Sequence, residues 1–501
     1  MGTMCEPIAS QVLESCLKVV RSSLYPSYLA FNSLVSLYYP TFEEIKYKET
    51  SILIKKILLT PIYTAFFIIF LPILCVFLPL RCLLVSLRKP FAYSEYHNEE
   101  TSEQERLIRE AIRSNNHIFG VGSANICIMP EILSRMNHLS NVDFRSLSIG
   151  KRIKEDQLMS GKKDNQVLNL SDSEGSNGSA FYFSNSTKSC KEKVLGDVSV
   201  SFPHLDILCV QEAWSSYHNK ALIRELHQCF PYIVHDVGVH SRKVNNFVLN
   251  SGHLVASRHP IEVVDFKAFT NFVDHGKIIS MGVLMIKLQL GPTKNNGQNV
   301  AYVFNTHLQS YQGTRNIISK QLDEVLEYSK EFINFNNQAD DNIAFCIVCG
   351  DFNMDNLSPA DQLHSNHKIF DLFEDFARIK PGVEKPWTVG TELRQDRMMD
   401  ADVSTPQLLK TALDDPVLRQ CYLLDADIEE HTHEALVYCH IKMDDQGNVR
   451  QVPEGGRRRI DHILFDKQYP LEVKGYHFVT RLAPLTDHIP VAMKFTCPNL
   501  Q

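Results

Sequence analysis

The chain reads Cys349-Gly350-Asp351-Phe352-Asn353-Met354 directly after a strand-like run, 343–348. Asp351 and Asn353 should therefore emerge where a buried strand ends. Residues at i and i+2 of an extended chain point to the same side. A carboxylate and a carboxamide would then face one point, which suits a hard cation, a phosphate and a water. Taken alone, the stretch could equally be a turn with Asx caps.

Other short polar motifs stand at the ends of further strand-like runs. The runs are 118–127 with Asn125, 205–212 with Glu212, 300–308 with His307, 460–465 with Asp461, and 491–495 preceded by Asp487 and His488. A carboxylate closing an apolar strand is costly unless it binds a cation or several donors. An ordinary salt bridge for Glu212 and a structural role for His307 are the alternatives.

The pair Asp487 and His488 indicates two different roles. Adjacent residues of an extended chain point in different directions, so one can approach a cation while the other acts as a base. Asp461 is suited to hold His488 by its second ring nitrogen.

Strands alternate with helical patterns from residue 198 onward, which predicts a layered α/β domain over 116–501. Within it, 130–150 is expected to be helical. Residues 151–195 are rich in Ser, Asn, Lys and Asp and poor in core residues, so we expect a disordered insertion there.

Composition excludes several classes of protein. The net charge is −7, so no basic field favours nucleic acid as a partner. The 13 cysteines form neither a CxxC pair nor a zinc pattern, which favours a reducing compartment.

Residues 1–90 are expected to form a membrane module. The run 57–80 carries no charge and is long enough to cross a bilayer, whereas 24–39 is expected to lie at the interface. Pro61, Pro72 and Pro79 leave a bent or re-entrant hairpin as an alternative to a straight span. Cys75 and Cys82 are candidates for acylation. Residues 91–115 are expected to be a juxtamembrane linker.

Six motifs in order carry a resemblance to a known family: Asn125, Gln211-Glu212, Asn305-Thr306-His307, Gly350-Asp351-Phe352-Asn353, Arg459-Ile460-Asp461 and Thr486-Asp487-His488-Ile489-Pro490. The set resembles the endonuclease/exonuclease/phosphatase superfamily and, within it, the membrane-anchored neutral sphingomyelinases. The resemblance implies an α/β fold, a DNase I-like four-layer sandwich of two packed β-sheets flanked by helices, with an N-terminal hydrophobic membrane module.

The resemblance also implies a role for each site residue. Glu212 would be a metal ligand with Asn125 near the metal, and the ion would be Mg²⁺, with Mn²⁺ as a possible substitute. Asp351 and Asn353 would position water and phosphate, and His488 would be the general base, oriented by Asp461. Asp487 would lie near the metal, and His307 would donate to a phosphoryl oxygen.

The implied activity is Mg²⁺-dependent hydrolysis of membrane sphingomyelin to ceramide and phosphocholine. The alternatives are another phosphodiester lipid, such as a lysophospholipid or a phosphatidylglycerol-type lipid, and a weakly active membrane scaffold. The scaffold alternative rests on a departure: the family's Asp-x-x-x-x-Lys-Gly segment falls here on Gly276 and Met281, with Asp274 and Lys277 nearby at a different spacing. His462 also replaces a common Tyr.

The partners and the location follow from the membrane module. Five basic residues flank the apolar run and could bind an anionic phospholipid such as phosphatidylserine: Lys55, Lys56, Arg81, Arg88 and Lys89. The catalytic domain is expected to face the cytosol from a Golgi, plasma, endoplasmic reticulum or mitochondrial membrane. Trp214 or Trp387 could stack on a choline cation.

Overall fold

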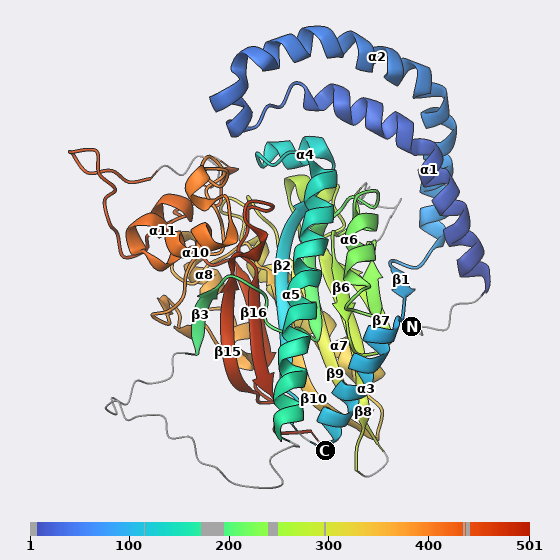
Figure 1. Cartoon of the computed structure of the whole chain (residues 1–501), viewed down its shortest axis with the longest axis vertical. Helices are drawn as coiled ribbons and strands as arrows, with labels where there is room; N and C mark the ends of the chain where they lie inside the picture. The colour runs from blue at the N-terminus through green and yellow to red at the C-terminus, as the bar shows by residue number, and fades with distance from the viewer. Residues whose placement is uncertain are drawn as a thin grey trace.

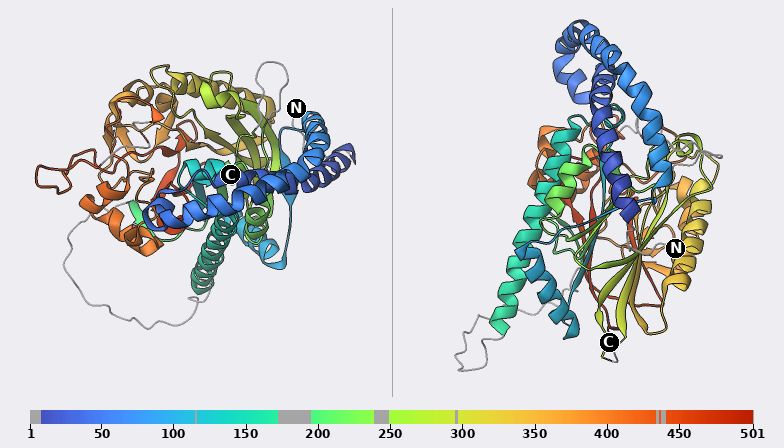
Figure 2. Two further views of the ribbon diagram at one scale, coloured as in Figure 1. Left: turned by 90° about the horizontal axis from the view of Figure 1, so that it is seen from above. Right: turned by 90° about the vertical axis from the view of Figure 1, so that its right-hand side faces the viewer.

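The computed structural model describes residues 8–500 except 115, 172–194, 239–248, 295–296, 434–435 and 437–440. Its centre is a pair of β-sheets packed face to face (Figures 1 and 2). The eight-stranded sheet has the order β1-β5-β6-β4-β2-β16-β15-β3, and the six-stranded sheet has the order β11-β14-β10-β9-β8-β7.

The strands of the eight-stranded sheet are β1 (Ala92–Glu95), β2 (Phe119–Ile128), β3 (Gly196–Ser199), β4 (Ile207–Ala213), β5 (Tyr232–His235), β6 (Leu254–Ser257), β15 (Glu472–Val479) and β16 (Val491–Thr496). Those of the six-stranded sheet are β7 (Ile261–Ala268), β8 (Gly282–Pro292), β9 (Gln298–His307), β10 (Asp341–Asp351), β11 (Phe373–Asp375) and β14 (Asp461–Asp466). A separate hairpin pairs β12 (Arg378–Lys380) with β13 (Val383–Glu384).

The helices are α1 (Ile8–Ser36), α2 (Phe42–Leu87), α3 (Glu99–Arg113), α4 (Glu131–Met136), α5 (Val142–Ser171), α6 (Asn219–Leu226), α7 (Ile317–Asn336), α8 (Gln362–Ser365), α9 (Ile369–Leu372), α10 (Pro406–Asp414) and α11 (Pro416–Tyr422). Short 3₁₀ turns include Asp274–Lys277.

Alternating side chains of the central strands fill two different apolar clusters. On β10, Phe345 and Ile347 face the interior between the sheets, whereas Cys346 and Val348 face outward under α7. This period of two is what a strand buried on both faces requires. Phe345 is packed between Phe119 and Phe495, at ring-centroid distances of 5.2 and 5.3 Å.

Helices cover both outer faces, which completes the four layers. Residues of α5 and α6 pack on the outer face of the eight-stranded sheet. Residues of α7 pack on the outer face of the six-stranded sheet. The right-hand view of Figure 2 shows the teal helix α5 and the yellow-orange helix α7 on opposite sides of the strands. The predicted four-layer α/β sandwich is confirmed.

The segment 91–115, expected as a linker, is instead part of the folded body wherever it is described. Its strand β1 pairs antiparallel with β5. Ile108 and Ile112 of α3 are buried in the cluster between the sheets. The amphipathic pattern of α3 was present in the sequence, but its high charge concealed the narrow apolar stripe that packs on the sheet.

The predicted insertion at 151–195 begins later than expected. Helix α5 continues from Val142 to Ser171, and its residues Ile153 and Gln157 are fully buried. Gln157 accepts a hydrogen bond from the backbone N–H of Leu205 at 2.8 Å and so ties the helix to the chain entering β4. The rest of the predicted insertion, 172–194, lies outside the described residues.

The two N-terminal helices lie along one end of the sandwich. Helix α2 is a single helix of 46 residues that contains Pro61, Pro72 and Pro79 and arches over α1 (Figure 1). Its segment Thr50–Leu87 is long and apolar enough to cross a membrane, with a peak mean hydropathy of 2.6 and only 6% of that window buried. A core helix of this length would be covered by protein, so α2 is compatible with a membrane anchor.

A buried carboxylate fixes these helices to the sandwich. Asp236 follows β5 and pairs with Arg21 of α1 and with Arg88 directly after α2, whose Nη1 lies 2.8 Å from Asp236 Oδ2. The two guanidinium groups hold the pKa of the Asp236 carboxyl well below its usual range, against the effect of burial. Arg135 of α4 adds a second link, 2.7 Å from Glu44 of α2.

The core packing predicts a contrast between two phenylalanines. Phe345→Ala should destabilise the protein by about 3–5 kcal/mol, because the ring leaves a cavity between the sheets. Phe335→Ala should change the stability by less than about 0.5 kcal/mol, because Phe335 is 66% exposed. Denaturant unfolding of the full chain in detergent measures both, and equal losses would contradict the packing described.

Candidate active site

The predicted site residues gather at one edge of the sandwich. The eight come from the carboxyl ends of β2, β4, β9 and β10, from the start of β14 and from the loop before β16: Asn125, Glu212, His307, Asp351, Asn353, Asp461, Asp487 and His488. Because these strands are neighbours in two packed sheets, their ends converge although the residues are far apart in sequence.

Asp351 is the centre of the cluster. One of its carboxylate oxygens accepts a hydrogen bond from Asn125 Nδ2 at 3.0 Å. The other accepts from the backbone N–H of Asn353 at 2.9 Å. His307 Nε2 lies 3.4 Å and His488 Nε2 lies 3.8 Å from the first oxygen. With 1% of the residue exposed, this carboxylate connects both sheets and both histidines.

Asn353 does not have the extended geometry that its spacing from Asp351 predicted. Strand β10 ends at Asp351, and Asn353 has a left-handed φ of 52°. Its Nδ2 donates to the carbonyl of Leu308 at 2.8 Å. The residue is therefore held against the end of β9, and its carboxamide oxygen is left for other partners.

Glu212 is a buried carboxylate with an unmet requirement. Its backbone has a left-handed φ of 60°, and its Oε2 is buried without a hydrogen-bond partner among the described residues. Burial, followed by the charge of Asp487, raises the pKa of Glu212 to about 8. Such a group is stable as an anion only beside a cation.

His488 is held by Asp461. The Nδ1 atom of the ring lies 2.9 Å from Asp461 Oδ2, which fixes the orientation of the imidazole. Thr391 Oγ1 accepts from the backbone N–H of Asp461 at 3.1 Å and so fixes the carboxylate in turn. Burial lowers the pKa of His488, but Asp461 and Asp351 outweigh it and raise the pKa well above its usual value.

His307 stands on the other side of Asp351. Its Nε2 lies 4.0 Å from Glu212 Oε1, and burial lowers the pKa of the ring despite the nearby Asp351. Trp214 stacks beside it with a centroid distance of 6.3 Å. Trp387, by contrast, packs on Tyr476 and Phe478 of the core.

Several other residues of the six motifs support the site without facing it. Asn305 of β9 accepts from Gln211 Nε2 at 2.7 Å and donates to the carbonyl of Val210 at 3.0 Å, so it joins the two sheets. Arg459 is buried between Asp375 and Glu384, both at 2.7 Å. These contacts fix the strand ends from which the site residues project.

Glu392 and Tyr311 lie near the cluster and were missed from the sequence. The backbone of Glu392 forms an isolated antiparallel β-bridge with that of His488. Burial raises the pKa of the Glu392 carboxyl, although Arg458 at 2.7 Å acts to lower it. Burial and the charges of Glu392 and Asp487 raise the pKa of Tyr311. Both residues lie in loops, where no periodicity marks a side chain that faces the site.

The segment that departs from the family's Asp-x-x-x-x-Lys-Gly pattern lies partly in the core. Met281, at the Lys position, is 4% exposed and packs under α7. Gly276, at the Asp position, could not carry a side chain without movement, because a Cβ would lie 2.6 Å from Gln309 Oε1. Asp274 pairs instead with Arg315 at 3.2 Å on the surface.

The donor set fits a divalent cation. Glu212, Asp351 and Asp487 offer carboxylates and Asn125 a carboxamide, which are the oxygen ligands that Mg²⁺ prefers. The unpartnered Glu212 Oε2 is the atom that a cation would satisfy.

Two His/Asp groups elsewhere also have ligand-like spacing: His117, Asp206 and His259, and Asp361, His364 and His431. In each of them, histidine–aspartate hydrogen bonds already join the groups.

Comparison with known proteins finds sequence similarity to phosphodiesterases. Human sphingomyelin phosphodiesterase 3 is 35% identical over 311 residues, which cover 60% of this chain and 46% of that protein. The chain is a relative of the sphingomyelin phosphodiesterases. Sphingomyelin phosphodiesterase 5 of Danio rerio is 27% identical over 466 residues, with 82% of both chains covered. The match to the human protein thus spans about half of its length, and no family model matches the chain.

Solved structures of low identity were also found. The magnesium-bound beta toxin of Staphylococcus aureus is 13% identical, with 76% of this chain and 100% of the toxin covered and a TM-score of 0.42. Sphingomyelinase C of Streptomyces griseocarneus is 15% identical, with 58% and 86% covered and a TM-score of 0.35.

The raised pKa of Glu212 predicts a pH-dependent affinity for Mg²⁺. A proton competes with the cation below about pH 8, so the affinity should be at least about tenfold weaker at pH 6 than at pH 8. Glu212→Gln should weaken binding and remove most of this dependence. The exposed control Glu327→Gln should keep it. Isothermal titration of the metal-free protein measures this, and an unchanged slope in Glu212→Gln would contradict the assignment.

The same pKa fixes the sign of a stability effect. Neutral Glu212 contributes stability that is fully present below about pH 4.5 and is lost as the pH rises through about 8. Added Mg²⁺ should therefore raise the melting temperature more at pH 8.5 than at pH 6. An equal rise in the melting temperature at both pH values would contradict the raised pKa of Glu212.

Proposed function

We propose that the chain is a membrane-bound, Mg²⁺-dependent phosphodiesterase that hydrolyses sphingomyelin to ceramide and phosphocholine. The observation that carries this proposal is the buried cluster around Asp351, with an oriented histidine at 3.8 Å and an unpartnered Glu212 oxygen. The names of the relatives, sphingomyelin phosphodiesterases 3 and 5, indicate the substrate.

His488 is the proposed general base. Its Nδ1–H donates to Asp461, which leaves Nε2 to take a proton from a water lying between it and Asp351. The water oxygen then attacks phosphorus in line with the leaving ceramide oxygen. One P–O bond forms while the other breaks, and no covalent enzyme intermediate is needed.

The remaining residues position the water and the phosphate. Asp351 and Asn353 would orient the water, and His307 would donate to a phosphoryl oxygen where negative charge builds up. Glu212, Asn125 and Asp487 would hold the cation. When bound, Mg²⁺ neutralises phosphate charge and stabilises the departing alkoxide. With the negative charges of Asp351 and Asp487 compensated by the cation, the pKa of His488 would also return toward the working pH.

The position of α2 favours a lipid substrate. The carboxyl end of β2 and the helix α4 that follows it face α1 and α2 (Figure 1). The site edge is therefore on the side of the apolar helix. We propose a membrane module over 1–90 and a catalytic domain over 116–501 that faces the cytosol, with the organelle left open among those named above.

We also propose an anionic phospholipid as an activator, but Arg88 is no longer a candidate for contacting it. The side chain of Arg88 is 3% exposed and pairs with Asp236, so it holds the fold together. Lys56 lies over the Tyr38 ring at 5.6 Å.

Replacement of the base tests the reaction. His488→Ala should lower kcat for phosphocholine release from sphingomyelin vesicles by about 10²–10⁴-fold. The control His477→Ala, whose ring pairs with Asp197 away from the site, should keep its activity. Release should require Mg²⁺ and stop with chelator. Turnover of another phospholipid but not of sphingomyelin would overturn the substrate, and inactivity of the folded protein on every lipid would favour a scaffold.

Removal of the orienting carboxylate tests its electrostatic role. Asp461 raises the pKa of His488, so Asp461→Asn should move the acidic limb of the kcat/KM profile to lower pH. The value of kcat should also fall by at least about tenfold, because the ring loses its fixed orientation. An acidic limb that stays in place or moves to higher pH would contradict this role.

A further inference from the structure

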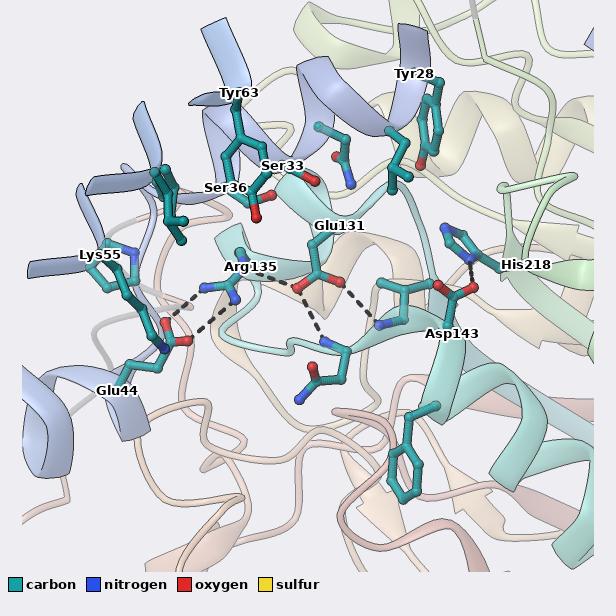
Figure 3. A pocket seen from close by; sticks show the side chains of 18 of the residues that line it. Tyr28, Ser33, Ser36, Glu44, Lys55, Tyr63, Glu131, Arg135, Asp143 and His218 are labelled. Atoms are coloured by element: carbon teal, nitrogen blue, oxygen red, sulfur yellow. Dashed lines mark hydrogen bonds and ion pairs between the residues drawn. The ribbon is translucent and has the colours of Figure 1, made fainter. Parts of the chain in front are cut away.

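A cavity of about 490 Å³ lies between the N-terminal helices and the sandwich, apart from the carboxylate cluster (Figure 3). Its roof is formed by α1 and α2, and its floor by α4, the start of α5 and His218 at the start of α6. Figure 3 shows Lys55 and Glu44 at one end and Tyr28, Asp143 and His218 at the other.

Buried polar atoms face this cavity without partners. Ser36 Oγ and His218 Nε2 are buried and have no hydrogen-bond partner among the residues that the structure describes. The other nitrogen of His218 lies 2.6 Å from Asp143 Oδ1. Buried polar atoms left without partners are costly, so two such atoms on one cavity indicate a polar occupant.

The charges of the lining identify the kind of occupant. Three carboxylates, Glu44, Glu131 and Asp143, oppose two cations, Lys55 and Arg135. Arg135 is used within the wall, where it pairs with Glu44 and Glu131 at 2.7 and 2.9 Å. The cavity therefore has no surplus positive charge for an anionic headgroup. The carboxylate at its other end is Asp143, whose side chain is 78% exposed and whose Oδ1 pairs with His218 Nδ1.

Aromatic rings surround the end that holds Asp143. Tyr25 and Tyr28 of α1 and Phe144 of α5 line the cavity there, whereas Tyr63 of α2 lies beside Ser36 toward the other end (Figure 3). Tyr28 stacks on Tyr217 at a centroid distance of 5.0 Å, which fixes its ring. Ring faces beside a carboxylate are the environment that binds a quaternary ammonium group.

The apolar surface next to the cavity completes the match to a lipid. Tyr63 lies on the part of α2 whose neighbouring side chains Ile62 and Phe66 are 47% and 48% exposed. Acyl chains that leave the cavity would continue along this surface, inside the bilayer that α2 is long enough to cross.

We propose that this cavity binds the headgroup of a choline phospholipid, as a site separate from the one that cleaves. The trimethylammonium group lies between the aromatic rings and Asp143. The phosphate accepts hydrogen bonds from the Ser36 hydroxyl and from Lys55, toward the opposite end of the cavity. The cavity thus recognises phosphatidylcholine as well as sphingomyelin. Its binding holds the edge that carries the carboxylate cluster at a choline-rich membrane surface.

Binding of short-chain lipids to the full-length protein in detergent tests this inference. We use the inactive background His488→Ala, so that the result does not depend on turnover, and titrate dihexanoyl-phosphatidylcholine and dihexanoyl-phosphatidylglycerol. Asp143→Asn should weaken phosphatidylcholine binding about tenfold and leave phosphatidylglycerol binding unchanged. The matched control Glu327→Gln on α7 should change neither. Tyr25→Leu, on α1, should weaken phosphatidylcholine binding in the same direction.

Two results would overturn the proposal. One is an affinity for phosphatidylcholine that Asp143→Asn and Tyr25→Leu leave unchanged, as expected if the cavity holds only water. The other is an equal loss for phosphatidylglycerol, which would show that the cavity does not read the choline group. In the active background, Asp143→Asn should keep Mg²⁺-dependent hydrolysis of sphingomyelin in detergent micelles. Failure of the hydrolysis assay with intact choline binding would overturn the proposed function alone.

Discussion

The structure depends on bringing carboxylates of like charge together at one buried edge. Glu212, Asp351 and Asp487 would repel one another there, and burial makes each charge more costly. Burial, followed by the charge of Asp487, raises the pKa of Glu212, and the charges of Asp461 and Asp351 raise the pKa of His488 against the effect of burial. A divalent cation would compensate the carboxylates and make the histidine available as a base. In the proposed mechanism, cation binding and base catalysis are therefore coupled.

The sandwich makes this arrangement possible because it holds the strand ends rigidly. The apolar layer around Phe345 sets the separation of the two sheets. Polar contacts such as Gln211 to Asn305 fix their relative position at the site end. The N-terminal helices are attached to the same body through Asp236. The apolar helix α2, the cavity beneath it and the carboxylate cluster thus lie on one side of the molecule.

Sequence patterns predicted what local periodicity and residue type can express. The alternation of strands and helices gave the layered fold, and polar residues at strand ends gave all eight residues of the cluster. The same patterns misjudged α3 and the start of α5, since a charged helix can still bury a narrow stripe such as Ile108 and Ile112. They also missed Glu392 and Tyr311, because side chains on loops follow no period.

The sequence by itself determined the class of site: acidic, amide and imidazole groups placed where strands end. Tertiary structure alone decided their geometry. It turned Asn353 out of the extended conformation, placed Met281 in the core, and joined Lys55 and Asp143 across one cavity. The physical reason is that these outcomes depend on contacts between residues distant in the chain, and their energies are settled only when the sheets and helices pack.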